Sequence, residues 1–235
     1  AGCTHAVVEM TSEGSRFFRH TFIGMDALVV TNLTPEHIES HGSFESYRDA
    51  KLSIARKLNT TRKKTKVLVV NGDDPEHGHF IDAAPRASVA TVTLEDGKPF
   101  DVSEPHQSTF MFGDTEITTK LPGEFNIMNM LQAGTLLETI GVDEETITQS
   151  LETFPGIRGR VEYVTLPNRT FDFEVVVDYA HTTQSLKSFY SIFENVYTIG
   201  ILGNTGGGRD TWKRPEMARV AEESCDEVIL TNEDP

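Results

Sequence analysis

The sequence predicts an α/β protein of two domains, because strand-like and helix-like patterns alternate along it and the alternation restarts past residue 155. In the first part, apolar and β-rich runs recur at residues 5–10, 27–33, 66–71 and 88–94. In the last part, the expected elements are strands at 173–179, 197–202 and 227–231 and helices at 183–195 and 214–224. Strands and helices that alternate at these lengths imply βαβ units and a parallel sheet.

The remaining elements of the first part follow from periodicity and capping. Residues 44–58 carry apolar side chains at helical spacing among charges, which predicts an amphipathic helix with Lys51 in its middle. Residues 99–120 alternate short polar and apolar runs, as hairpin strands do. A helix at 126–140 is closed by Gly141, and Asp143 caps another helix that ends near residue 154.

The domain boundary is predicted where turn-forming residues interrupt the pattern. Pro155, Gly156 and Gly159 do so, which places the boundary and a hinge at residues 154–160. The expected domains are therefore 1–155 and 156–235. Only three strands follow the boundary, so we expect the second domain to be incomplete. The chain starts with Ala1 rather than Met, and we interpret it as a piece of a longer protein.

The bulk composition excludes several classes of function. Hydrophobic residues make up 37% and charged residues 24%, as in a packed globular protein. The net charge of -15 argues against nucleic acid as a partner, since such binders concentrate Lys and Arg on one face. Cys3 and Cys225 offer neither a disulfide framework nor zinc spacing, which fits a reducing cytoplasm. No apolar run approaches the roughly 20 residues of a membrane helix, and no signal peptide is visible.

Polar side chains gather where the predicted strands end. Glu9 follows the first strand, Glu36 and His37 follow the second, and Asp178 and His181 follow the strand at 173–179. Ligands of open α/β sheets bind outside the carboxyl ends of the strands, so these side chains are candidate site residues. One such cluster is more often ordinary turn chemistry, and only the combination is informative.

That combination resembles the Mur ligase family in order and spacing, nearly from end to end. The matching motifs of the first domain are Glu9-Met10-Thr11-Ser12-Glu13-Gly14, Thr31-Asn32-Leu33-Thr34-Pro35-Glu36-His37, His41-Gly42, Tyr47-Arg48-Asp49-Ala50-Lys51, Asn71-Gly72-Asp73-Asp74-Pro75 and Gly123-Glu124-Phe125-Asn126-Ile127-Met128-Asn129. Those of the second are Gly159-Arg160-Val161-Glu162, Asp178-Tyr179-Ala180-His181-Thr182 and Lys213-Arg214-Pro215. The resemblance implies a truncated central ATPase-type domain followed by an incomplete Rossmann-like C-terminal domain.

Within the family, the motifs look most like the ligases that add the third residue to UDP-N-acetylmuramoyl-dipeptide in peptidoglycan synthesis, a cytoplasmic step tied to cell shape and cell division. The resemblance implies ATP and Mg²⁺ as cofactors, and a UDP-muramoyl-peptide and a free amino acid as substrates. ATP would phosphorylate the substrate carboxylate, and the incoming amine would displace phosphate from the acyl-phosphate. Because both reactants are anionic, magnesium and cationic side chains must neutralise them.

The family pattern assigns metal binding to Glu9, His37 and Lys51. A carboxylate such as that of Glu9 is a hard-oxygen ligand suited to Mg²⁺. The family lysine that matches Lys51 carries a carbamate formed with CO₂, which replaces a cation by an anion able to face a second magnesium. Composition alone favours an ordinary lysine, whereas position in the family pattern favours the carbamate.

Substrate contacts are also carried over from the family. Ser12 and Arg19 match residues that contact the muramoyl peptide, and a guanidinium suits a carboxylate because it binds in a bidentate way. Arg16 is the alternative to Arg19. Arg209, in a glycine-rich turn at 203–210 that is not a P-loop, is expected to meet the carboxylate of the incoming amino acid, and Asp234 is expected near it.

Nucleotide contacts are implied for Asn126, Asn129, Asp178, Arg160 and Lys213. An amide can donate to and accept from the adenine edge, although Asn126 is also a good candidate helix N-cap. Asp178 matches a carboxylate that holds the ribose, and Arg160 matches an arginine near the γ-phosphate. The resemblance therefore implies that Lys51 and Arg160 are catalytic residues and that His181 has a supporting role.

Several departures limit what the resemblance implies. Glu13 replaces a family His, and Thr183 replaces a Pro. The chain ends in Asn-Glu-Asp-Pro at 232–235, where diaminopimelate-adding enzymes carry Asp-Asn-Pro-Arg, so lysine, diaminopimelate and other diamines stay open. No Gly-x-x-x-x-Gly-Lys-Ser/Thr motif is present, so we expect the phosphate cradle upstream of Ala1 and expect these 235 residues alone to be inactive.

Two other functions stay open on the sequence. A folate-type polyglutamate ligase would share the fold and the phosphoryl chemistry, but the Tyr179-containing turn speaks against it. A degenerate, non-catalytic binding module is disfavoured by the joint presence of five family residues, Glu9, His37, Lys51, Asp178 and Arg160. The oligomeric state cannot be derived from these patterns.

Overall fold

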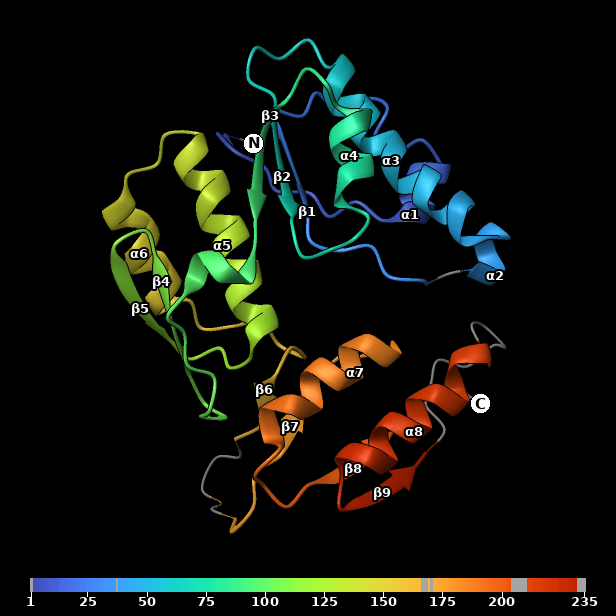
Figure 1. Cartoon of the computed structure of the whole chain (residues 1–235), viewed down its shortest axis with the longest axis vertical. Coiled ribbons are helices and arrows are strands. Elements are labelled where there is room, and N and C mark those ends of the chain that lie inside the picture. The colour runs from blue at the N-terminus through green and yellow to red at the C-terminus, as the bar shows by residue number, and fades with distance from the viewer. Residues whose placement is uncertain (1, 37, 166–168, 170, 204–210, 232–235) are drawn as a thin grey trace. The chain divides into compact units, whose positions relative to one another are not determined.

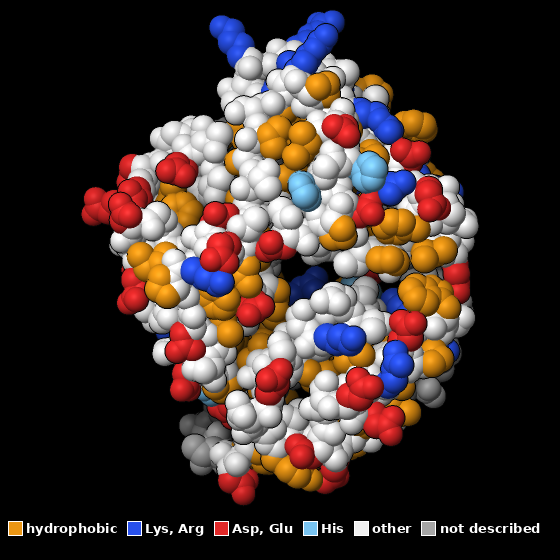
Figure 2. Space-filling model, viewed as in Figure 1, with side chains coloured by type: hydrophobic (Ala, Val, Ile, Leu, Met, Phe, Trp, Pro, Cys, Tyr) orange, Lys and Arg blue, Asp and Glu red, His pale blue; other side chains and the backbone are white. Residues whose placement is uncertain are grey.

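The computed structural model in Figure 1 describes residues 2–36, 38–165, 169, 171–203 and 211–231. The chain forms two compact units, Ala1–Thr91 and Val92–Pro235. Helices and strands are mixed in both, which confirms the predicted α/β class. None of the helices in the described part is long and apolar enough to cross a bilayer. Asp and Glu side chains are spread over the face shown in Figure 2, in line with the net charge of -15.

The first unit is built on a three-stranded sheet in the order β1 (Ala27–Val30), β2 (Val67–Asn71) and β3 (Ser88–Val92). β1 and β2 are parallel, and the crossover between them contains α2 (Ile38–His41) and α3 (Phe44–Thr60). α4 (His77–Ala83) lies between β2 and β3 in the chain. The strands predicted near 27–33, 66–71 and 88–94 and the helix predicted at 44–58 are therefore confirmed.

The central strand β2 forms the core of this unit. Leu68 and Val70 pack with the apolar stripe of α3 and with Phe80 of α4, and Figure 1 shows both helices on the same side of the sheet. Val67 and Val69 occupy the alternate positions and are buried as well. β2 is therefore covered on both faces, as parallel strands usually are.

The prediction of a strand at residues 5–10 is wrong. Residues 2–11 contain no helix or strand, and Val7 is fully exposed. The local apolar pattern is present, but a strand also needs a neighbour to bond its backbone, and none of the described strands pairs with this segment. The chain instead forms the short helix α1 (Ser12–Arg16), whose first turn is capped by the Thr11 hydroxyl accepting from the backbone N–H of Gly14 at 3.0 Å.

The second unit begins with the 3₁₀ turn η1 (Leu94–Gly97), the antiparallel hairpin β4 (Ser108–Phe112) and β5 (Thr115–Thr119), and the helices α5 (Glu124–Thr139) and α6 (Glu144–Thr153). The hairpin, both helices and the Asp143 cap are as predicted. Asn126 is not the N-cap, because α5 begins at Glu124. Its side-chain amide donates instead to the backbone oxygen of Pro122 at 2.8 Å.

The last part of the chain contains one predicted βαβ unit. β8 (Ile199–Leu202) and β9 (Glu227–Leu230) are parallel, and η3 (Thr211–Lys213) and α8 (Arg214–Ser224) lie between them in the chain. α8 packs on α7 (Thr183–Tyr190), which η2 (Ser191–Phe193) follows.

The strand predicted at 173–179 is reduced to β7 (Val176–Val177), which pairs antiparallel with β6 (Glu162–Tyr163) and not with β8. The prediction of a single parallel sheet over this part is therefore wrong. Phe173, Val175 and Val177 alternate as strand residues do, but all three are exposed, so their pattern marks no buried face.

The β6–β7 hairpin contacts the loop before β4. The Tyr163 hydroxyl donates to the backbone oxygen of Pro105, and the ring of His106 lies 4.5 Å from the ring of Tyr163. His106 Nε2 is also 3.2 Å from a carboxylate oxygen of Glu174. Segments on either side of the predicted boundary at 154–160 are thus in direct contact.

Candidate active site

Lys51 lies mid-helix on α3 and is half-buried, with its Nζ 5.9 Å from the centre of the Tyr47 ring. Burial lowers the pKa of Lys51, whereas the nearby charges of Glu36 and Glu9 act in the opposite direction. Glu9 precedes α1, and Glu36 lies in the loop after β1. Two carboxylates from separate segments therefore act on the charge of one lysine.

The Tyr47 ring lies beside the Lys51 side chain. The tyrosine side chain is buried, and its ring meets the ring of His41 edge-on at 5.4 Å. Burial raises the pKa of Tyr47, and the charges of Glu36 and Asp74 add to the shift. Glu36 was named among the polar side chains at the strand ends, but no role in metal, nucleotide or substrate binding was predicted for it. Its position one residue before His37 was the available signal.

Ser12 and Arg19 flank the same α1 segment but differ in exposure. Ser12 is buried, and its Oγ lies 3.1 Å from Nε2 of His41. Arg19 is exposed just after α1. Arg16, the alternative, donates to the backbone oxygen of Ser40 at 2.6 Å. Arg16 is therefore engaged by α2, whereas the Arg19 side chain is exposed.

Glu13, which replaces the family His, also contacts α2. It accepts a hydrogen bond from the Ser40 hydroxyl at 3.0 Å. The anion introduced at this position therefore has a structural partner in the first unit.

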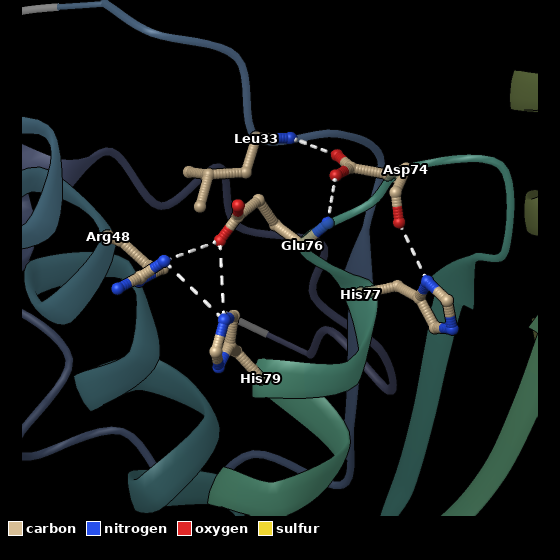
Figure 3. Close-up of polar contacts among 6 residues, drawn as sticks. All are labelled: Leu33, Arg48, Asp74, Glu76, His77 and His79. Atoms are coloured by element: carbon tan, nitrogen blue, oxygen red, sulfur yellow. Dashed lines mark hydrogen bonds and ion pairs between the residues drawn. The ribbon is translucent and has the colours of Figure 1, made fainter.

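A buried carboxylate holds the loop that leads to Glu36. Asp74 accepts hydrogen bonds from the backbone N–H groups of Leu33 and Glu76, the latter at 2.8 Å (Figure 3). Asn71 donates from its side chain to the backbone oxygen of Thr31 at 3.0 Å. Asn71 is the last residue of β2 and Asp74 follows the strand; both reach across to the loop after β1, so they fix the start of that loop. Asp74 is a loop-anchoring residue whose role the sequence motif did not reveal.

An ion pair extends this anchor to α3. Arg48 donates to Glu76 at 2.9 Å, and His79 lies 3.7 Å from the same carboxylate oxygen (Figure 3). Hydrogen bonding to Glu76 and its charge raise the pKa of Arg48, which stays fully protonated. The helix that carries Lys51 is thereby tied to the loop after β2.

In the second unit, Asp178 organises the turn that presents Arg160. Its two carboxylate oxygens accept from the backbone N–H groups of Val161 at 2.8 Å and Ala180 at 2.7 Å. Gly159 N–H donates to the Glu162 carboxylate at 2.7 Å, which closes the same turn. Each Asp178 oxygen retains a second lone pair, so the carboxylate can still accept from a ligand hydroxyl.

Three side chains stack beside this turn. The guanidinium of Arg160 lies 4.8 Å from the centre of the Tyr179 ring. The ring of His181, two residues further along the chain, lies 4.8 Å from the same ring, centre to centre. His181 Nδ1 is 2.9 Å from the backbone oxygen of Tyr179, an acceptor, so we assign the hydrogen to Nδ1 and the lone pair to Nε2. Tyr179 was named in the motif but was not predicted as a site residue.

The other predicted nucleotide residues lie elsewhere in the second unit. Asn126 and Asn129 are three residues apart on α5 and share one face of the helix, with Asn129 exposed. Lys213 is buried at the start of α8. His37, Arg209 and Asp234 lie outside the described residues. Among the residues that are described, no three His, Cys, Asp or Glu side chains form a metal-binding group.

Comparisons with known proteins decide the family. The sequence model of the Mur ligase middle domain matches residues 1–137, which is more than half of the chain. The chain belongs to the Mur ligase family. The model described as "Mur ligase, glutamate ligase domain" matches residues 159–235 of this Mur ligase.

Relatives of this Mur ligase include the UDP-N-acetylmuramyl-tripeptide synthetase of Roseiflexus sp., which is 35% identical over all of the chain and 49% of its own length. The UDP-N-acetylmuramoyl-L-alanyl-D-glutamate--2,6-diaminopimelate ligase of Chlorobaculum tepidum is 34% identical, again over all of the chain and 49% of its own length. The chain thus spans about half the length of these curated relatives.

Solved structures agree on the fold. MurF from Acinetobacter baumannii matches with a TM-score of 0.77 and 17% identity, over 91% of this chain and 48% of its own. A folylpolyglutamate synthase from Mycobacterium tuberculosis matches with a TM-score of 0.68 and 16% identity, over 91% and 49%. At these identities the likeness shows the fold alone.

Proposed function

We propose that the full-length gene product is an ATP-dependent ligase that adds an amino acid to a UDP-N-acetylmuramoyl-dipeptide in the cytoplasm, as part of peptidoglycan synthesis. The observation that carries the proposal is that the half-buried Lys51, beside the Tyr47 ring, is under the influence of the carboxylate charges of Glu36 and Glu9. The named functions of the relatives in Roseiflexus and Chlorobaculum supply the substrate class. Residues 1–155 and 156–235 are the proposed working domains, with 154–160 as the hinge.

Glu9 and Lys51 fit a magnesium site, with His37 as a further proposed ligand. Carboxylate oxygens are hard ligands of the kind that Mg²⁺ prefers, and Glu36 adds another nearby. Bound Mg²⁺ would neutralise charge on the phosphates and on the substrate carboxylate. The protein's own contribution is to anchor the loop after β1, which carries Glu36.

A carbamate on Lys51 would complete the ligand set. The neutral amine attacks the carbon of CO₂, a C–N bond forms, one C=O π bond opens to give an oxyanion, and the nitrogen releases a proton to water. The buried position of Lys51 lowers its pKa and so increases the fraction of the nucleophilic neutral amine. Beside Glu9 and Glu36 the resulting anion needs a cation, which supports carbamate and metal binding together.

The second unit supplies the proposed nucleotide contacts. Arg160 is held over Tyr179, where its guanidinium can meet a phosphate oxygen, and Asp178 can accept from the ribose hydroxyls. Asn126, Asn129 and Lys213 are the further nucleotide contacts that we propose. His181 supports this turn, and Arg209 and Asp234 are proposed to meet the incoming amino acid.

Ligation then runs in two steps. A carboxylate oxygen of the muramoyl peptide attacks the γ-phosphorus of ATP, and the bond to the β–γ bridging oxygen breaks to release ADP. The amine of the incoming amino acid attacks the carbonyl carbon of the acyl-phosphate, loses a proton and expels phosphate. Ser12 and Arg19 are proposed to orient the muramoyl peptide for the first step.

The test is ATP turnover by the full-length gene product. ADP release that depends on both UDP-N-acetylmuramoyl-L-alanyl-D-glutamate and an amino acid is the expected result, and parallel reactions with lysine and with diaminopimelate identify that amino acid. Turnover with a folate in place of the muramoyl peptide would instead assign a polyglutamate ligase. Binding without any turnover would assign a non-catalytic module.

A further inference from the structure

A buried polar network joins α1 to α3 in the first unit. The Oγ of Ser15 on α1 lies 2.5 Å from the backbone oxygen of Ala50 and 2.5 Å from the Oγ of Ser53, both on α3. The Oγ of Ser53 lies 2.8 Å from the same Ala50 oxygen and 3.4 Å from Nε2 of His20. Ser15 and His20 are only 3% and 7% exposed, and Ser53 is half-buried.

The hydrogen atoms of this network can be assigned by counting donors. The three contacts among Ser15, Ser53 and the Ala50 oxygen, at 2.5–2.8 Å, are shorter than the 3.4 Å contact to His20, so the two hydroxyl hydrogens are assigned to them and neither is left for His20. The imidazole must therefore donate from Nε2 to Ser53, which leaves a lone pair on Nδ1. Nδ1 is indeed buried without a hydrogen-bond partner. An orphan acceptor there is tolerated better than an orphan N–H would be.

The network lies between two groups of proposed site residues. Ala50 directly precedes Lys51 in the chain, while α1 carries Ser12, and Arg19 directly precedes His20. A five-residue helix such as α1 has no stability of its own and takes its position from its neighbours. Apolar contacts would allow it to slide along α3, whereas directed hydrogen bonds to one backbone oxygen fix its register.

We infer that Ser15, His20 and Ser53 are positioning residues, which hold the substrate-binding segment around Ser12 and Arg19 in register with Lys51. The inference rests on the proposed ligase function. None of the three is proposed to touch substrate, nucleotide or metal. Their role is to set the distance between the group that binds the muramoyl peptide and the group that handles the reacting phosphate.

The test compares Ser15→Ala and Ser53→Ala with the matched control Thr60→Ala in the full-length gene product. Thr60 also lies on α3, and its hydroxyl donates to backbone oxygens of the same helix, so the control removes a helix hydroxyl far along the chain from Lys51. Each network variant should lower kcat/KM for UDP-muramoyl-dipeptide about tenfold, as expected for a lost buried hydrogen bond. The KM for ATP should stay unchanged, and Thr60→Ala should leave both parameters within about twofold.

Two further variants separate positioning from general stability. Ser53→Thr keeps the hydroxyl and should recover most of the lost kcat/KM, and the Ser15→Ala, Ser53→Ala double variant should be no worse than the poorer single variant. Variants that melt at a lower temperature but retain wild-type kinetics would overturn the inference, because the network would then be only structural.

Amide hydrogen exchange tests the network independently of the proposed function. A wild-type protein with no turnover on UDP-muramoyl-dipeptide would refute the ligase assignment. In that case, Ser15→Ala should still speed exchange in residues 12–19 about tenfold relative to Thr60→Ala, because α1 loses its hydrogen bonds to Ala50 and Ser53. Equal exchange in the two variants would overturn the network on its own.

Discussion

Replacement of Asp74 by Ala should destabilise the first unit strongly. The buried carboxylate accepts from the N–H groups of Leu33 and Glu76, and both lose their acceptor in the variant. A hydrogen bond to a charged group contributes about 1.5–3 kcal/mol. Water can reach part of the site, since Asp74 is 8% exposed, so we expect a loss near the lower end of the sum, about 3 kcal/mol. Asp74→Asn keeps one acceptor oxygen and should cost about half as much.

The assay is amide hydrogen exchange in the strands that Asp74 bridges. Peptides that cover β1 and β2 should exchange about a hundredfold faster in Asp74→Ala, the factor that corresponds to about 3 kcal/mol of opening free energy. Asp82→Ala is the matched control, because Asp82 is an exposed carboxylate on α4 of the same unit. A change in Asp74→Ala no larger than that in Asp82→Ala would refute the reasoning.

Three further predictions concern the same two units. Lys51→Ala should abolish ATP turnover by the full-length gene product, with bicarbonate unable to restore it, whereas Lys64→Ala should be neutral; equal activities would remove Lys51 from the site. Burial lowers the pKa of His20 in the folded protein below 6.5, so as the pH falls the unfolded chain binds a proton at His20 before the folded chain does. The free energy of unfolding is therefore unaffected by this group above about pH 6.5 and should decline below that pH. His20→Gln should reduce the loss in Tm between about pH 7.5 and about pH 5.5, and an undiminished loss would contradict this. Gly134→Ala should destabilise the second unit by about 1–3 kcal/mol, because the added carbon would lie 2.4 Å from the Phe112 ring. Phe112→Leu should rescue it in the double variant, as judged by urea unfolding.

Local patterns predicted those elements whose own side chains supply the core. The helix around Lys51 and the strand β2 are examples, since their apolar residues are buried where periodicity requires. The strand predicted at 5–10 failed because pairing depends on a partner elsewhere in the chain. The exposed Val7 shows that alternation alone does not create that partner.

Site residues were predicted through family motifs, and their contacts were not. Glu36 and Asp74 both belonged to the family motifs. The charge of Glu36 acts on Lys51, and Asp74 accepts a hydrogen bond from Leu33, but in each case the two residues are far apart in sequence. The Ser15–Ser53 contact spans two helices in the same way, and no local spacing signals it. Periodicity reports which face of an element is buried, whereas these hydrogen bonds depend on how two elements meet.

The most direct test of the proposed ligase follows oxygen atoms. With both oxygens of the reacting carboxylate of UDP-muramoyl-dipeptide labelled with ¹⁸O, the full-length gene product should release phosphate that carries one ¹⁸O atom for each peptide bond formed. That transfer is required if the carboxylate attacks the γ-phosphorus and the amine later expels phosphate. Phosphate released without label, at a rate that matches product formation, would contradict the acyl-phosphate route and with it the roles proposed for Lys51 and Arg160.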